Sequence, residues 1–147
     1  NHLANTLIEL NCGGECGINQ FGIENLRVLK NLNVSSNKKI KNINHLANTL
    51  IKLNCVYSGI DQEGIKYLKI LQKINASSNE KIKNVNHLAN TLIELNCGGN
   101  CGIGQNEICG LRKLKYLYAY NNNNIYNVNH LANTLIELNC AGNCGID

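Results

Sequence analysis

The sequence of 147 residues lacks methionine altogether. It also lacks any apolar run near the roughly 20 residues that a membrane-spanning helix requires, and any basic start followed by a hydrophobic core that would mark a signal peptide. No segment therefore predicts a membrane span or a targeting signal. Because a natural chain starts with methionine and repeat arrays end in polar caps, we expect the sequence to be the interior of a longer array.

The motifs of common catalytic sites are absent too. There is no Ser/His/Asp arrangement, no glycine loop that could cradle a phosphate, and no pair of carboxylates with a cleft to hold it. We therefore expect no enzymatic activity, no cofactor and no small-molecule substrate.

One phrase dominates what is present. The residues Asn-His-Leu-Ala-Asn-Thr-Leu-Ile-Glu/Lys-Leu-Asn-Cys occur four times, beginning at Asn1, Asn44, Asn86 and Asn129. The copies are 43, 42 and 43 residues apart, and a fixed period of this length indicates units that stack along one axis. Function should therefore lie on a repetitive surface and not in a deep pocket.

The segments between the copies follow the same apolar pattern, which halves the period. Each half contains a short stretch of alternating inward and outward residues, as in a half-buried strand. We predict seven coils over residues 1–147, stacked as one domain with a parallel sheet. The strand centres are Leu10, Leu32, Leu53, Ile74, Leu95, Leu117 and Leu138, at steps of 21 or 22 residues.

These coils resemble leucine-rich repeats. The pattern L-x-x-L-x-L-x-x-N-x-x-I fits 29–40, 92–103 and 114–125, and the likeness covers the whole chain. The even coils resemble the short 22-residue class, and others resemble the cysteine-containing class or repeats of amoeba-associated bacteria and giant viruses. The resemblance implies an α/β solenoid, or horseshoe, with the sheet on the concave face and short helices, 3-10 turns or loops on the convex face.

An asparagine column should follow the strands where the chain turns. A buried amide there can donate to and accept from backbone groups that have lost their strand partners. We assign this structural ladder to Asn37, Asn79, Asn100, Asn122 and Asn143, with Glu15 and Ser58 as departures from the pattern.

Eight cysteines pose a choice between disulfides and free thiols. Cys12, Cys55, Cys97 and Cys140 follow their strand centres by two residues, so they should point into the core as small hydrophobic side chains. Equivalent cysteines lie two coils apart, roughly 10 Å, beyond the ~7 Å limit on Cα separation in a disulfide. Local bonds within C-x-x-x-C pairs, such as Cys97 with Cys101, stay open. We expect free thiols and a cytoplasmic location, in the source or in a host cell.

The histidines His2, His45, His87 and His130 recur with the phrase, which suggests a metal site. Each lies on the side of its coil opposite the strand, and successive histidines are two coils apart. Zinc needs its ligands within ~2.3 Å of one point. We therefore predict no metal site.

The outward side chains of the strands form the candidate site. The central outward column is a row of asparagines interrupted by Tyr118, and Tyr116 and Tyr120 project from the same strand. Tyrosine combines a large area with a polar tip, and it is common at binding hot spots. The predicted contact residues are Tyr116, Tyr118, Tyr120, Asn96, Asn139, Glu94, Glu137 and Tyr57.

Other interpretations of this face stay open. The rings could simply cover small neighbours such as Gly98 and Ala141. The asparagines could bond one another along the axis or offer their amides to a partner. The sequence does not separate these alternatives.

We expect a protein partner for a non-catalytic recognition scaffold. One alternative is a structural role, in which unpaired strand edges at uncapped ends associate with one another. Another is an extracellular adhesin, favoured by the sequons that begin at Asn33 and Asn75. The net charge is +4 and lysines gather in the even coils. Since such lysines usually form a solvated rim, we do not expect nucleic-acid binding.

Overall fold

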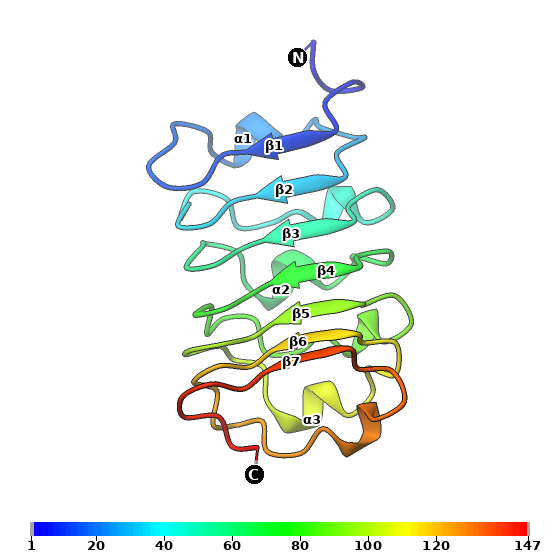
Figure 1. The fold of residues 1–147 in the computed structure, drawn as a ribbon. Coiled ribbons are helices and arrows are strands. Elements are labelled where there is room, and N and C mark those ends of the chain that lie inside the picture. Colours follow the sequence, from blue (N-terminus) through cyan, green and yellow to red (C-terminus); the bar gives the residue numbers. More distant parts are fainter. Residues whose placement is uncertain (1, 147) are drawn as a thin grey trace.

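The computed structural model describes residues 2–146, which form one sheet of seven strands in sequence order (Figure 1). Every neighbouring pair of strands is parallel, and the two ends of the chain lie at opposite ends of the stack. The strands are β1 (Glu9–Asn11), β2 (Asn31–Asn33), β3 (Lys52–Asn54), β4 (Lys73–Asn75), β5 (Glu94–Asn96), β6 (Tyr116–Tyr118) and β7 (Glu137–Asn139).

The register of the sheet follows the sequence repeat. Leu10 pairs with Leu32, and equivalent residues pair in every later coil, through Leu53, Ile74, Leu95, Leu117 and Leu138. With strands ~4.8 Å apart, the sheet extends roughly 30 Å along its axis. The predicted solenoid of seven coils with a parallel sheet is confirmed.

Short helices of two kinds alternate between the strands. The α-helices are α1 (Gln20–Ile23), α2 (Gln62–Ile65) and α3 (Gln105–Ile108), and the 3-10 helices are η1 (Asn44–Leu46), η2 (Asn86–Leu88) and η3 (Asn129–Leu131). They lie on one side of the sheet and leave its other face open (Figure 1). Side chains cap two of the α-helices, because Asn19 and Asp61 accept hydrogen bonds from the N–H groups of Gly22 and Gly64.

The interior between sheet and helices is a continuous apolar core. The central strand residues from Leu32 to Leu117 are at most 3% exposed, whereas Leu138 in the last coil is 36% exposed. Cys12, Cys55 and Cys97 are buried in this core as expected, and Cys140 is half-buried.

All eight cysteines are free thiols, as predicted. Burial raises the pKa of Cys12 to about 11, and the neighbouring Cys16 adds to the effect. Burial also raises the pKa of Cys101 to about 11, and it raises those of Cys55 and Cys97. These thiols therefore stay protonated at neutral pH and act as small apolar side chains.

Buried asparagines tie even coils to the coils before them. The Nδ2 group of Asn79 donates to the carbonyls of Cys55 and Ile60 at 3.0 and 3.1 Å, and its Oδ1 accepts from the N–H of Lys81 at 3.2 Å. Asn37 and Asn122 make the same three bonds in their own coils. Each amide replaces strand partners that the turn removes.

Asn100 and Asn143 do not belong to this ladder, contrary to our expectation, because both are exposed. Their coils have as many residues between the strand centre and the isoleucine that follows as the even coils have, so the difference lies in the turn. The N–H of Cys101 donates to the carbonyl of Gly99 at 2.8 Å, whereas that of Asn79 donates to the carbonyl of Ala76 at 3.0 Å, and this tighter turn moves the inward position on by one residue. Cys101 occupies the inward position in one of these coils: it is 5% exposed, and its sulfur accepts a hydrogen bond from the backbone of Ile103. Ser58 takes the same place in the shorter odd coil, where it accepts from the N–H of Ile60 at 3.2 Å.

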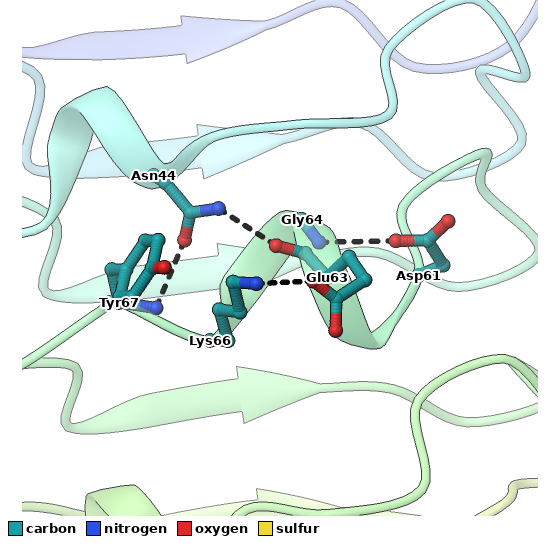
Figure 2. A network of polar contacts seen from close by, with 6 residues as sticks. All are labelled: Asn44, Asp61, Glu63, Gly64, Lys66 and Tyr67. Carbon is teal, nitrogen blue, oxygen red and sulfur yellow. Dashed lines mark hydrogen bonds and ion pairs between the residues drawn. The ribbon is translucent and has the colours of Figure 1, made fainter.

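A second set of polar contacts joins the coils on the helical side (Figure 2). Asn44, in η1, donates to the carbonyl of Glu63 at 2.7 Å and accepts from the N–H of Tyr67 at 3.0 Å. Glu63 also pairs with Lys66, whose ammonium lies 5.0 Å from the centre of the Tyr67 ring. One asparagine of the repeated phrase thus satisfies backbone groups around the end of the next coil's helix.

Candidate recognition surface

The open face of the sheet carries a shallow hollow of about 340 Å³ over β1 to β5. The strands form its floor. Its walls are the outward side chains of two neighbouring columns, the central asparagine row and the residues two positions before each member of that row. The lining residues outside the central strand positions are Glu9, Asn11, Asn31, Asn33, Lys52, Asn54, Lys73, Asn75 and Glu94. The hollow lies beside the tyrosine strand β6, and nothing in the sequence indicated its position.

Tyr116 and Tyr118 stand at one end of the hollow. Tyr116 pairs in register with Glu94 and Glu137, and Tyr118 pairs with Asn96 and Asn139. Both tyrosines are half-buried. The sheet register therefore brings six of the predicted contact residues together on three neighbouring strands.

Charged groups next to these tyrosines are linked to one another. The Lys73 ammonium lies 2.5 Å from a carboxylate oxygen of Glu94 and 6.0 Å from the centre of the Tyr116 ring. Partial removal from water raises the pKa of Tyr118, and a hydrogen bond to the Glu137 carboxylate adds to this rise. The Tyr118 hydroxyl therefore remains a neutral hydrogen-bond donor at physiological pH.

Tyr120 has a different environment from the two other tyrosines. It follows β6, and its ring lies over Gly98 so closely that a β-carbon there would come within 2.6–2.7 Å of three ring atoms. The ring covers a small neighbour, which is the structural alternative that the sequence left open for these tyrosines. We therefore treat Tyr116 and Tyr118, rather than Tyr120, as the candidate anchors.

Tyr57 lies apart from this cluster. It sits in the turn after β3 with a left-handed backbone (φ 49°), is 58% exposed, and has the Lys38 ammonium 6.0 Å from its ring centre. It lines a separate small hollow with Lys38, Lys81 and Asn100. The structure does not bring Tyr57 together with the other predicted contact residues.

Histidines of the repeated phrase contact the backbone of the preceding coil. The Nε2 atoms of His45 and His130 lie 3.0 and 2.9 Å from the carbonyl oxygens of Ile23 and Ile108, at the ends of α1 and α3. Residues 2–146 contain no cluster of three or more histidine, cysteine or acidic side chains that could hold a metal ion. Among the same residues, no helix is long and apolar enough to cross a membrane.

Comparison with solved structures identifies the architecture. Internalin C2 from Listeria monocytogenes, a leucine-rich-repeat protein, matches with a TM-score of 0.66 and 23% sequence identity over 90% of this chain. This chain has the leucine-rich-repeat fold. It spans 60% of the internalin chain, and at this identity the likeness concerns the fold alone. No protein-family model and no curated protein matches the sequence.

Proposed function

We propose that this leucine-rich-repeat chain is a non-catalytic recognition module that binds a protein partner through the open face of its sheet. The observation that carries the proposal is the position of Tyr116 and Tyr118, side by side at the end of the hollow and in register with two carboxylates and two amides. Large side chains with polar tips beside a shallow hollow are typical of protein-binding hot spots.

A matched pair of variants tests this proposal. Tyr116→Ala with Tyr118→Ala removes two rings from the open face, whereas Tyr67→Ala with Tyr126→Ala removes two exposed rings, 59% and 62% accessible, outside it. Protein binders are selected from a displayed library against the parent chain, and their affinities for both variants are then measured by titration.

We expect most binders to lose at least about tenfold in affinity toward the first variant and to keep their affinity for the second, since truncation of a hot-spot residue costs about 2 kcal/mol or more. Equal binding to the parent and to both variants would show that the open face is not the recognition surface.

A further inference from the structure

Each asparagine of the central row uses its side-chain oxygen within its own coil. The backbone N–H two residues further on donates to Oδ1 at 3.0–3.3 Å. This bond forms in six coils, at Asn11, Asn33, Asn54, Asn75, Asn96 and Asn139. It is the local turn that asparagine side chains commonly form with their own backbone. The orientation of every amide in the row is therefore fixed.

With the oxygens engaged, the nitrogens are the free groups. Within residues 2–146, no Nδ2 atom of these six asparagines donates a hydrogen bond to the protein. Asn11, Asn33, Asn54 and Asn75 line the hollow, and neighbouring strands in register are ~4.8 Å apart. The hollow therefore contains a regular row of hydrogen-bond donors, and an amide row whose members bond one another is not observed.

Not every charged side chain around the hollow has a partner. Glu9 accepts a hydrogen bond from Asn31, and Glu94 is paired with Lys73. Lys52 lies midway between these pairs in the same column and has no acidic partner within the described residues. The centre of the hollow thus combines free amide donors with one free positive charge.

We propose that the segment recognised here is an acidic peptide, whose carboxylates accept hydrogen bonds from the Nδ2 groups of Asn54 and Asn75 and pair with Lys52. The inference rests on the proposed recognition function and specifies its partner. A carboxylate accepts several hydrogen bonds and supplies the missing charge, whereas a neutral acceptor leaves Lys52 unpaired. A nucleic acid would bring a continuous line of charge toward Glu9 and Glu94 at the two ends, which disfavours it.

The probe is a short fluorescent peptide with a central run of glutamates, and its control is the same peptide with glutamines. Fluorescence anisotropy reports binding to the parent chain and to variants. The donor variant is Asn54→Ser with Asn75→Ser, because a serine hydroxyl keeps the turn, more weakly, without adding charge, and its single O–H lies nearer the strand than the amide donors that it replaces. The matched control is Asn48→Ser with Asn90→Ser, which changes two exposed asparagines next to η1 and η2.

We expect the glutamate peptide to bind the parent at least about tenfold more tightly than the glutamine peptide, since hydrogen bonds to an ionised acceptor are stronger than those to a neutral one. The donor variant and Lys52→Gln should each weaken binding about tenfold, and the control variant should bind like the parent. Thermal unfolding checks that all variants remain folded.

Three results would overturn the inference: equal binding of both peptides, unchanged binding by the donor variant, or binding of a single-stranded oligonucleotide or a neutral glucan in preference to the acidic peptide. The tyrosine variants separate this failure from failure of the proposed function. If selected protein binders still depend on Tyr116 and Tyr118, only the acidic specificity is wrong. If they do not, the recognition face itself is wrong.

Discussion

The ring of Tyr120 lies on Gly98, one coil away, with three ring atoms 2.6–2.7 Å from the position that a β-carbon would occupy. Gly98→Ala therefore forces the ring to move. We expect unfolding free energy to fall by about 1 kcal/mol, at the low end for overpacking, because the ring is the mobile end of a side chain. A double-mutant cycle in urea measures this. The cost should vanish in the Tyr120→Ala background, and an unchanged cost there would show that the two residues are not coupled.

Asn79 and Asn100 provide a matched pair for the asparagine ladder. Asn79→Ala removes the donor to two carbonyls and the acceptor for one N–H in the interior, so stability should fall by about 3 kcal/mol or more. Asn100 is exposed, and its replacement by alanine should change stability by no more than about 0.5 kcal/mol. Chemical denaturation measures both. Equal losses at the two positions would contradict the one-residue shift of the ladder.

The fold followed from the sequence because the leucine period leaves one register for the strands. Placing Leu10 against Leu32 fixes every outward column, so the clustering of Tyr116 and Tyr118 with Glu94 and Glu137 could be predicted. The ladder could be predicted only where the turn keeps one conformation. In the Cys-Gly-Gly turn the N–H of Cys101 donates to the carbonyl of Gly99, which puts Cys101 inside and Asn100 outside, and the apolar pattern does not register that change.

The chemistry of the open face was less predictable. The amides of the central row are oriented by the backbone N–H two residues later, which donates to each side-chain oxygen and, among the described residues, leaves the nitrogen free. This bond depends on the geometry of the turn, which the sequence pattern does not specify. The unpaired charge on Lys52 could not be predicted from the sequence either. Its column contains lysines and glutamates in the sequence, but only the packed side chains show that Glu94 pairs with Lys73.

Acid should destabilise the protein through its histidines. Burial lowers the pKa of His45 and of His87, with the positive charge of Arg27 also lowering that of His45. As the pH falls, a histidine whose pKa is lower in the folded state is protonated at a higher pH in the unfolded chain than in the folded one, so acid favours the unfolded chain. Its contribution is therefore complete above the ordinary pKa of about 6.5 and is lost as the pH falls toward the lower folded value.

The double variant His45→Gln with His87→Gln tests this pH dependence. Glutamine can still donate to the backbone carbonyl but does not titrate. Between about pH 7 and pH 5, unfolding free energy from urea titrations should decline less steeply for the variant than for the parent. Identical slopes for the two proteins would mean that other groups cause the acid sensitivity.

Gly64 marks a close approach of two coils on the helical side. A β-carbon at this residue would lie 2.0 Å from the carbonyl oxygen of Lys41, and the contacting atom belongs to the backbone, so no side chain can swing aside. The carbonyl of Gly64 also accepts a hydrogen bond from Ile43 at 3.0 Å, which holds the coils at that distance. Gly64→Ala should therefore separate the coils and lower unfolding free energy by about 3 kcal/mol, at the upper end for overpacking.

Gly17→Ala is the control, since its β-carbon would meet no atom within 4 Å. Urea denaturation of both variants decides the matter: a Gly64 variant as stable as the Gly17 variant would show that the coils are not packed this closely.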